Sequence, residues 1–317
     1  MDWIMSLSIS HRAGVIIIGL LVLATLIILA LKRIKPDGQW ETLLQRVKSW
    51  WMMAGLFFIA LVSNRIISII FFAFVSFWAF KEFITILDTR RADHRALFWA
   101  FLTIPVQYFW VGIHWYGMFI IFIPVYIFLF LPIRQVLSKE TSGFLASTSK
   151  IQWGLMAFVF GLSHMAFLLN MPNVAGSEAN GHSLLLFLVV LTELNDVFQF
   201  IWGKSFGKKK ILPSVSPNKT WVGFIGGVLT TILVGFFFRF LTPFDLKMVL
   251  IVSLVIGVSG FCGDVVMSAV KRDAGVKDFS NLIPGHGGML DRMDSLCYTA
   301  PLFFHIVKYF YYYSYNW

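Results

Sequence analysis

The stretch of sequence richest in chemical groups begins inside an apolar segment, where Asp264, Ser268 and Lys271 are spaced i, i+4 and i+7. In an α-helix this spacing places the three side chains on one face. A charged carboxylate in an apolar membrane helix costs about 2.5–3.5 kcal/mol on insertion scales, so its presence needs a reason. A structural ion pair is one such reason. An acid, a hydroxyl and a base that lead into a polar loop are more typical of the wall of a binding site.

The polar loop after this helix combines glycine with basic side chains. Three of the four residues from 285 to 288 are glycines, which let the backbone approach a ligand closely and present its amides to an anion. Lys271, Arg272 and Lys277 precede this turn and supply the positive charge that phosphate recognition needs. His286, within the turn, is either a base or a hydrogen-bonding partner of phosphate or backbone. The loop therefore predicts a phosphate site.

Two further carboxylates precede the last apolar segment. Asp291 and Asp294 are spaced i, i+3, so on a helix that has already begun they share a face near its positive N-terminal end. Either one alone would suit helix capping. Together with Asp264 and the basic loop, they suit Mg²⁺ held against a nucleotide triphosphate. Zinc is disfavoured because no Cys and His spacing fits it, and Cys262 and Cys297 are isolated thiols.

A second polar region is a loop with five lysines around a predicted turn, in which Ser216 and Lys219 lie just before the next apolar segment. Such a loop suits phosphate binding, although cytoplasmic loops are basic in any case. In the apolar helix before it, Glu193, Asp196 and Gln199 are spaced i, i+3, i+6 and form roughly one polar stripe. An acid inside a membrane span is a functional candidate by default, which points to Asp196.

The elements that must position these groups are membrane helices. Hydrophobic residues make up 58% of the 317 residues and charged residues 13%, and the mean hydropathy is +0.77. A soluble protein could not bury so much apolar surface, so we expect an all-α, polytopic integral membrane protein with short loops and no soluble domain. About ten transmembrane helices are predicted, at 14–31, 50–62, 66–87, 96–111, 115–131, 151–171, 183–202, 221–241, 246–269 and 297–312.

The net charge of +10 indicates cytoplasmic loops and not a nucleic-acid partner. With ten spans, five basic segments fall on one side of the membrane and both termini on the other. We therefore expect the polar loops to face the cytosol and both termini to lie outside. The expected location is the bacterial inner membrane, with the site on the cytosolic side. The five segments hold 20 of the 26 Lys and Arg residues, at 32–48, 88–95, 134–150, 203–220 and 270–293.

The run from Ser268 to Asp294 resembles the signature of the CDP-diacylglycerol synthases, also called phosphatidate cytidylyltransferases. The segment from Ser216 to Thr220 is similar to the family's Ser-Pro-x-Lys-Thr element, and Asp196 matches a family aspartate. A chance match over the 27 residues of the signature is negligible. Its matching positions are Ser268, Lys271, Arg272, Lys277, Asp278, Pro284, His286, Gly287, Gly288, Asp291, Arg292 and Asp294.

The resemblance implies that Asp264 and Asp291 bind Mg²⁺, and that CTP and phosphatidate give CDP-diacylglycerol and pyrophosphate. Two anions must be held together for an in-line attack, so the site must position them and neutralise their charge. We expect Lys219, Lys271 and Arg292 to neutralise charge. The expected catalytic residues are Asp264, Lys271, Asp291, Arg292 and Asp294. The expected substrate-binding residues are Asp196, Ser216, Lys219, Ser268, Arg272, Lys277, His286, Gly287 and Gly288.

The resemblance covers mainly the C-terminal half. Within one transmembrane domain, 1–317, we expect 183–317 to be the catalytic half and 1–150 to be helices without a recognised motif. Relatives often place small residues after the aspartate matched by Asp196, and Glu or Gln where this chain has Val222. Gln199 needs a hydrogen-bonding partner, either in the protein or on the lipid.

Alternative functions stay open at this point. One is another CTP-dependent enzyme, such as a polyprenol kinase or a cytidylyltransferase for a different phospholipid. A second is a transporter, which would also have basic and acidic side chains among its membrane helices. A third is a catalytically silent relative, which would bind CTP without turnover. A homodimer is left open as well.

Overall fold

The computed structural model describes residues 9–34, 40–90, 93–174, 177–283 and 287–312. Helices dominate this part of the chain, so the all-α class is confirmed, and each of the ten predicted spans falls on a helix. Six helical stretches are long and apolar enough to cross a membrane: Gly14–Ile34, Arg65–Thr85, Tyr116–Val136, Phe144–Leu168, Gly181–Phe206 and Leu246–Asp273. Two shorter apolar helices, Val47–Leu61 and Trp221–Phe237, accompany them among the described residues. The chain is thus a helical integral membrane protein, and the number ten stays a prediction.

The helical elements follow one another with short connections. The N-terminal elements are α2 (Ile9–Ile34), α3 (Trp40–Val62), α4 (Arg65–Thr85), α5 (His94–Gly112), α6 (Tyr116–Ile121), η2 (Phe122–Ile127), α7 (Phe128–Val136), α8 (Phe144–Gly154), η3 (Leu155–Gly161) and α9 (Leu162–Leu168). The C-terminal elements are α10 (Gly181–Phe206), β1 (Lys210–Leu212), β2 (Ser216–Thr220), α11 (Trp221–Phe237), η4 (Arg239–Leu241), α12 (Leu246–Asp273), α13 (Leu290–Met293) and α14 (Leu296–Tyr311).

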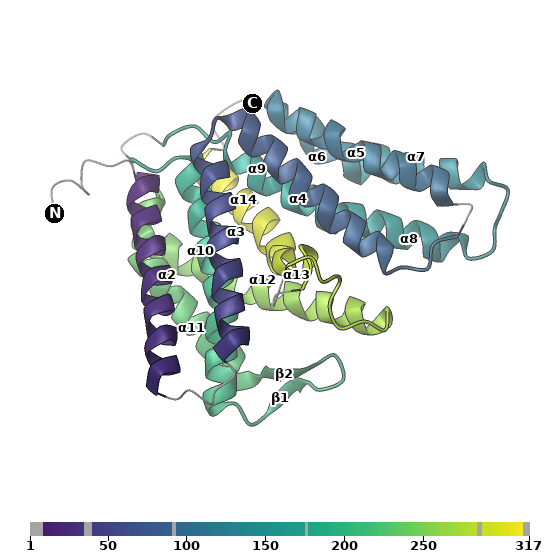
Figure 1. The fold of residues 1–317 in the computed structure, drawn as a ribbon. Helices are drawn as coiled ribbons and strands as arrows, with labels where there is room; N and C mark the ends of the chain where they lie inside the picture. Colours follow the sequence, from purple (N-terminus) through teal and green to yellow (C-terminus); the bar gives the residue numbers. More distant parts are fainter. Residues whose placement is uncertain (1–8, 35–39, 91–92, 175–176, 284–286, 313–317) are drawn as a thin grey trace.

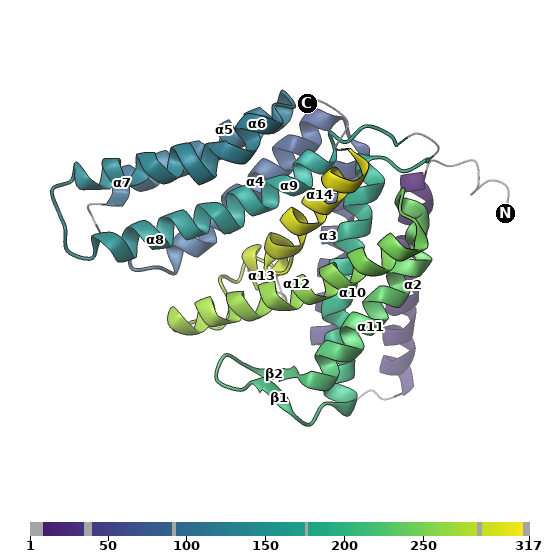
Figure 2. The ribbon, with the colours of Figure 1, turned by 180° about the vertical axis from the view of Figure 1, so that it is seen from behind.

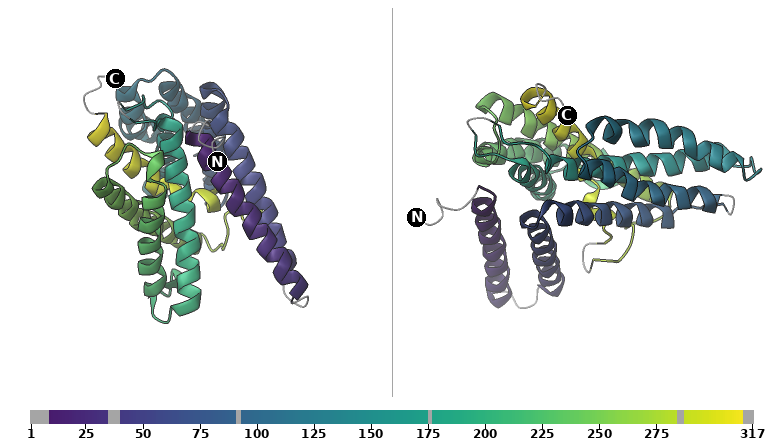
Figure 3. Two further views of the ribbon diagram at one scale, coloured as in Figure 1. Left: turned by 90° about the vertical axis from the view of Figure 1, so that its left-hand side faces the viewer. Right: turned by 90° about the horizontal axis from the view of Figure 1, so that it is seen from above.

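The helices form two groups that diverge from each other (Figure 1). One contains α2, α3, α10 and α11, and the other contains α4 to α8, which extend away from it. Helices α12 and α14 lie between the two groups and pack on each other, while α14 also contacts α9 (Figure 2). Seen from above, α2 and α3 project to one side of the other helices (Figure 3). Helices α12 and α14 therefore lie between the two groups, and the signature segment runs from the end of α12 to the start of α14.

Helices α10 and α11 approach each other closely because α11 is rich in glycine. A Cβ atom at Gly227 would lie 2.3 Å from Cγ of Gln199, and one at Gly226 would lie 2.6 Å from the Trp202 ring. Only a residue without a side chain fits there. This contact fixes the second half of α10 beside the start of α11, and so places the acids of α10 near the lysine that precedes α11.

The loop between α10 and α11 contains an element that the sequence analysis missed. Strands β1 and β2 pair in an antiparallel hairpin, with Lys210 opposite Thr220 and Leu212 opposite Ser216. The hydroxyl of Thr220 then accepts a hydrogen bond from the amide of Gly223 at 3.0 Å and caps α11. The lysine-rich loop is therefore a structured hairpin and not only a turn.

The one-sided distribution of basic loops leads to a topology prediction. Asp273 is exposed at the end of α12, and a cysteine in its place should react with a membrane-impermeant maleimide from the cytosolic side only. The exposed Cys262 should first be replaced by serine, whereas Cys297 is buried. Labelling of intact cells and of inverted vesicles checks the result. Reaction from the outer face would overturn the proposed orientation.

Candidate active site

A cavity of about 720 Å³ opens where α10, β2, α12, the following loop and α13 meet. Its wall carries six acids and four basic side chains, so charge dominates the surface. Such a mixture suits an anionic ligand bound together with a cation. The charged residues that line it are Glu193, Asp196, Lys219, Asp264, Lys271, Lys277, Asp278, Asp291, Arg292 and Asp294.

An ion pair between Lys219 and Asp264 lies at the centre of this wall. The Lys219 amine also donates a hydrogen bond to Oε1 of Gln199 at 3.2 Å, and the Ser268 hydroxyl lies 3.4 Å from Oδ1 of Asp264. Burial lowers the pKa of Lys219, but Asp264 and Asp196 raise it by more, so the pKa is raised overall. The lysine is therefore a fixed positive charge. The oxygen of Gln199 has its partner in the protein, whereas its buried Nε2 has none among the described residues.

Three carboxylates gather around that lysine. Asp196 accepts a hydrogen bond from the Ser295 hydroxyl through Oδ2 at 2.8 Å, while its buried Oδ1 has no protein partner among the described residues. Burial raises the pKa of Asp294 to about 8, and the nearby Asp264 and Asp196 add to the shift. Carboxylates that repel one another in this way favour a bound cation.

Asp291 has a different environment, because both of its oxygens already accept hydrogen bonds. Oδ1 accepts from the Lys271 amine at 2.9 Å, and Oδ2 accepts from the backbone amides of Phe279 and Gly288, each at 2.9 Å. Gly287 has φ of +81°, and a Cβ atom there would lie 2.7 Å from Asp291 Oδ2. Asp291 thus ties together α12, the glycine-rich loop and α13.

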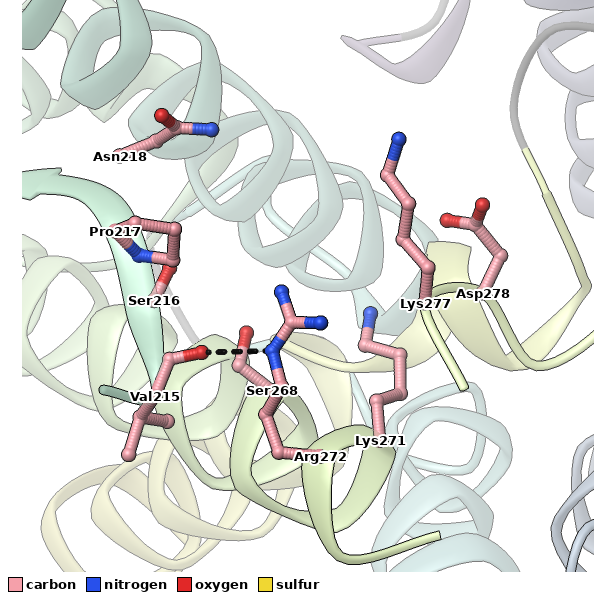
Figure 4. Close-up of a pocket in the computed structure, with 9 residues that line it drawn as sticks. All are labelled: Val215, Ser216, Pro217, Asn218, Ser268, Lys271, Arg272, Lys277 and Asp278. Carbon is pink, nitrogen blue, oxygen red and sulfur yellow. Dashed lines mark hydrogen bonds between the residues drawn. The ribbon is translucent and has the colours of Figure 1, made fainter. Parts of the chain in front are cut away.

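A smaller pocket of about 150 Å³ adjoins the first, between the hairpin and the end of α12 (Figure 4). Arg272 and Lys271 extend from α12 in a similar direction, and Lys277 lies beside them on the following loop. Arg272 Nε donates to the carbonyl of Val215 at 3.3 Å, which holds the hairpin against α12. Ser216 and Ser268 also line this pocket. Its basic wall suits phosphate groups.

The protein family follows from comparison with known sequences. The cytidylyltransferase family matches residues 44–310. The chain belongs to that family. The chain is therefore a nucleotidyltransferase enzyme, and the family match reaches into helices α3 to α9, where no motif had been recognised.

Individual relatives agree with this assignment. The chain is 44% identical over 294 residues to the uncharacterized protein YnbB of Escherichia coli (strain K12), and the match covers 92% of this chain and 96% of that protein. It is 35% identical over 157 residues to the phosphatidate cytidylyltransferase of Staphylococcus haemolyticus (strain JCSC1435), covering 49% of this chain and 60% of that protein. It is 36% identical over 170 residues to the phosphatidate cytidylyltransferase of Haemophilus influenzae, covering 50% of this chain and 54% of that protein.

The structure brings most of the predicted site residues to the two adjoining pockets. Lys271 and Lys277 line both of them, while Arg272 lines only the smaller one. Gly288 lines neither pocket and instead donates its amide to Asp291. His286 lies outside the described residues. The larger pocket therefore gathers Asp196, Lys219, Asp264, Lys271, Lys277, Gly287, Asp291, Arg292 and Asp294, and the smaller one Ser216, Ser268, Lys271, Arg272 and Lys277.

Sequence reasoning missed one buried acid beside this site. Glu82, near the end of α4, is only 5% exposed and accepts hydrogen bonds from the loop that carries the signature. An acid inside an apolar segment was the available signal. This signal did not lead to a prediction for Glu82, because residues 1–150 resemble no recognised motif.

The carboxylates fit Mg²⁺ in part. No group of three His, Cys, Asp or Glu side chains among the described residues is arranged to hold a metal by itself. Mg²⁺ commonly uses one or two carboxylates and completes its shell with substrate phosphates and water. Asp264 and Asp294 line the cavity, and Asp264 would have to share its carboxylate between the cation and Lys219. Asp291 would first have to release Lys271 or a backbone amide.

Proposed function

We propose that the enzyme transfers a cytidylyl group from CTP to phosphatidate, forming CDP-diacylglycerol and pyrophosphate. The observation that carries this proposal is the joined pair of pockets, in which a carboxylate cluster and a basic wall share Lys271 and Lys277. The named relatives from Staphylococcus and Haemophilus support the choice of acceptor. The site also lies among membrane helices, which suits an acceptor whose acyl chains stay in the bilayer.

In the proposed reaction an oxygen of the lipid phosphate attacks the α-phosphorus of CTP. A new P–O bond forms as the bond to the β-phosphate breaks, and the electron pair leaves with pyrophosphate. The lipid phosphate is ionised at neutral pH, so no strong general base is needed. Catalysis therefore consists of holding two anions in line and neutralising their charge.

The residues of the two pockets can divide this work. The smaller pocket would hold phosphates of CTP through Arg272, Lys277 and the hydroxyls that line it. Lys219 and Lys271 would neutralise charge where the two substrates meet. Mg²⁺, when bound by Asp264 and Asp294, would supply further charge neutralisation and orient the phosphates.

One assay tests the proposal against its alternatives. The purified protein is incubated with labelled CTP, phosphatidate and Mg²⁺, and lipid and nucleotide products are resolved. We expect labelled CDP-diacylglycerol and one pyrophosphate per turnover. Release of CDP would indicate a kinase, turnover with only another phospholipid would indicate a different acceptor, and CTP binding without turnover would indicate a silent relative.

Membrane placement is part of the same proposal. We infer that the enzyme lies in the bacterial inner membrane with both pockets open to the cytosol, from which CTP arrives. The basic loops support this orientation.

A further inference from the structure

Glu82 connects the N-terminal helices to the signature loop. It lies near the end of α4, and its Oε1 accepts hydrogen bonds from the Ser280 hydroxyl at 2.7 Å and the Met289 amide at 3.0 Å. Its Oε2 accepts from the Leu290 amide at 2.8 Å. All three donors belong to the segment between α12 and α13 or to the first turn of α13. One carboxylate from a distant helix thus holds Ser280, which precedes the glycine-rich loop at 285–288, and Met289 and Leu290, which follow it.

The contact with Glu82 leaves no room for a side chain at residue 288, which is a glycine. A Cβ atom at Gly288 would lie 2.4 Å from Glu82 Oε2 and 2.8 Å from the Ser280 hydroxyl oxygen. Its amide meanwhile points to Asp291 Oδ2 at 2.9 Å. The backbone at Gly288 therefore passes between two carboxylates, and a residue with a side chain could not pass there without moving one of them.

The loop held in this way carries residues of both pockets. Lys277 and Asp278 precede Phe279, whose amide is bound by Asp291. Arg292 and Asp294 follow the amides bound by Glu82 and line the larger cavity. A displacement of this segment would therefore move charged groups on both sides of the bound phosphates.

We propose that Glu82 is a positioning residue for the reaction, which sets the glycine-rich loop and α13 against α12. The positioning role of Glu82 rests on the proposed function in one respect, namely that CTP is the ligand of the site. It gives a role to α4, for which the sequence had shown none. It also assigns the glycine at 288 to the approach of Glu82 and not to direct contact with a phosphate.

A graded series at Glu82 provides the first test. Gln keeps an oxygen for Ser280 and Met289 but turns an NH₂ group toward the Leu290 amide, whereas Ala removes all three acceptors. We expect kcat/KM for CTP to fall about tenfold in Glu82→Gln and about a hundredfold in Glu82→Ala. KM for the lipid should change less than twofold. Glu140→Gln, at an exposed acid of the N-terminal half, is the matched control and should be silent.

A double-mutant cycle provides the decisive test. Gly288→Ala should be severe in the wild-type chain because its Cβ meets Glu82. In the Glu82→Ala chain, Gly288→Ala should lower kcat/KM by less than about threefold further. The carboxylate that obstructs the Cβ atom is gone, and the Ser280 hydroxyl, which that carboxylate held 2.8 Å from the Cβ position, is free to rotate away. Effects that multiply would place Gly288 at the ligand and overturn the proposal, as would normal CTP kinetics in Glu82→Ala.

Binding of labelled CTP in detergent, without lipid, is measured for every variant beside turnover. A wild-type enzyme that binds CTP but rejects phosphatidate would contradict the proposed function, while the mutant cycle could still be measured through CTP binding.

Hydrogen exchange distinguishes a local positioning role of Glu82 from a general loss of the folded structure. In Glu82→Ala the amides of Met289 and Leu290, which lose their acceptors, should exchange faster, while those of α14 should keep their protection. Faster exchange throughout α14 would overturn a local role for Glu82.

Discussion

Asp264→Asn should lower kcat by at least about a hundredfold, with the protein still inserted and folded. The amide keeps the shape of the side chain but loses the charge that pairs with Lys219 and that a cation would need. The loss should persist at saturating CTP and lipid, because the missing interaction stabilises charge during transfer and not only substrate binding. Steady-state kinetics in mixed micelles, with Mg²⁺ varied, measure the effect.

The matched control for this change is Asp273→Asn. Asp273 ends the same helix, α12, but it is exposed and lines neither pocket. We expect its kinetics to be within twofold of wild type. Near-normal turnover in Asp264→Asn would remove this carboxylate from the chemistry and would make its pair with Lys219 a purely structural one.

Lys219→Ala should produce a loss of similar size. The lysine amine forms an ion pair with Asp264 and donates a hydrogen bond to Gln199. Its positive charge also offsets the repulsion between Asp196 and the neighbouring carboxylates of Asp264 and Glu193. Removing one partner of a largely buried ion pair leaves a carboxylate uncompensated, which is far more damaging than the loss of an exposed pair. We therefore expect a drop in kcat/KM of at least about a hundredfold for both substrates.

Lys210→Ala is the control that distinguishes charge neutralisation at the site from a general contribution of basic loops to membrane insertion and topology. Lys210 lies on the paired strand of the same hairpin, opposite Thr220, and is exposed. Its replacement should leave turnover and membrane insertion unchanged. Equal losses at Lys210 and Lys219 would mean that the lysines of the hairpin serve insertion and topology and not phosphate chemistry.

The helices and the central charged residues could be predicted from the sequence because their signals are local. Apolar runs of membrane length mark the helices, and the spacing of Asp264, Ser268 and Lys271 identifies one face of α12. The hairpin was missed because five lysines and a turn carry no strand alternation. Its pairing depends on contacts with α12, such as the bond from Arg272 to Val215.

The partners of the carboxylates could not be predicted for a related reason. Asp291 was assigned to a metal from the resemblance, yet its oxygens accept hydrogen bonds from residues 3, 12 and 20 positions away. Glu82 meets residues about 200 positions away. Sequence spacing identifies a shared helix face, but it contains no information on which distant backbone amide will reach a carboxylate.

The distance along the chain between Glu82 and its donors has a consequence for biosynthesis. Ser280 is 198 residues downstream, so at about 5–20 residues per second α4 is made some 10–40 s before the loop that its carboxylate holds. During that interval an acid near the membrane end of α4 has to remain hydrated or be shielded by another protein. A nascent chain that ends before residue 280 contains none of the three donors that Glu82 has in the complete structure, so the acid stays without these partners until the last part of the chain is made.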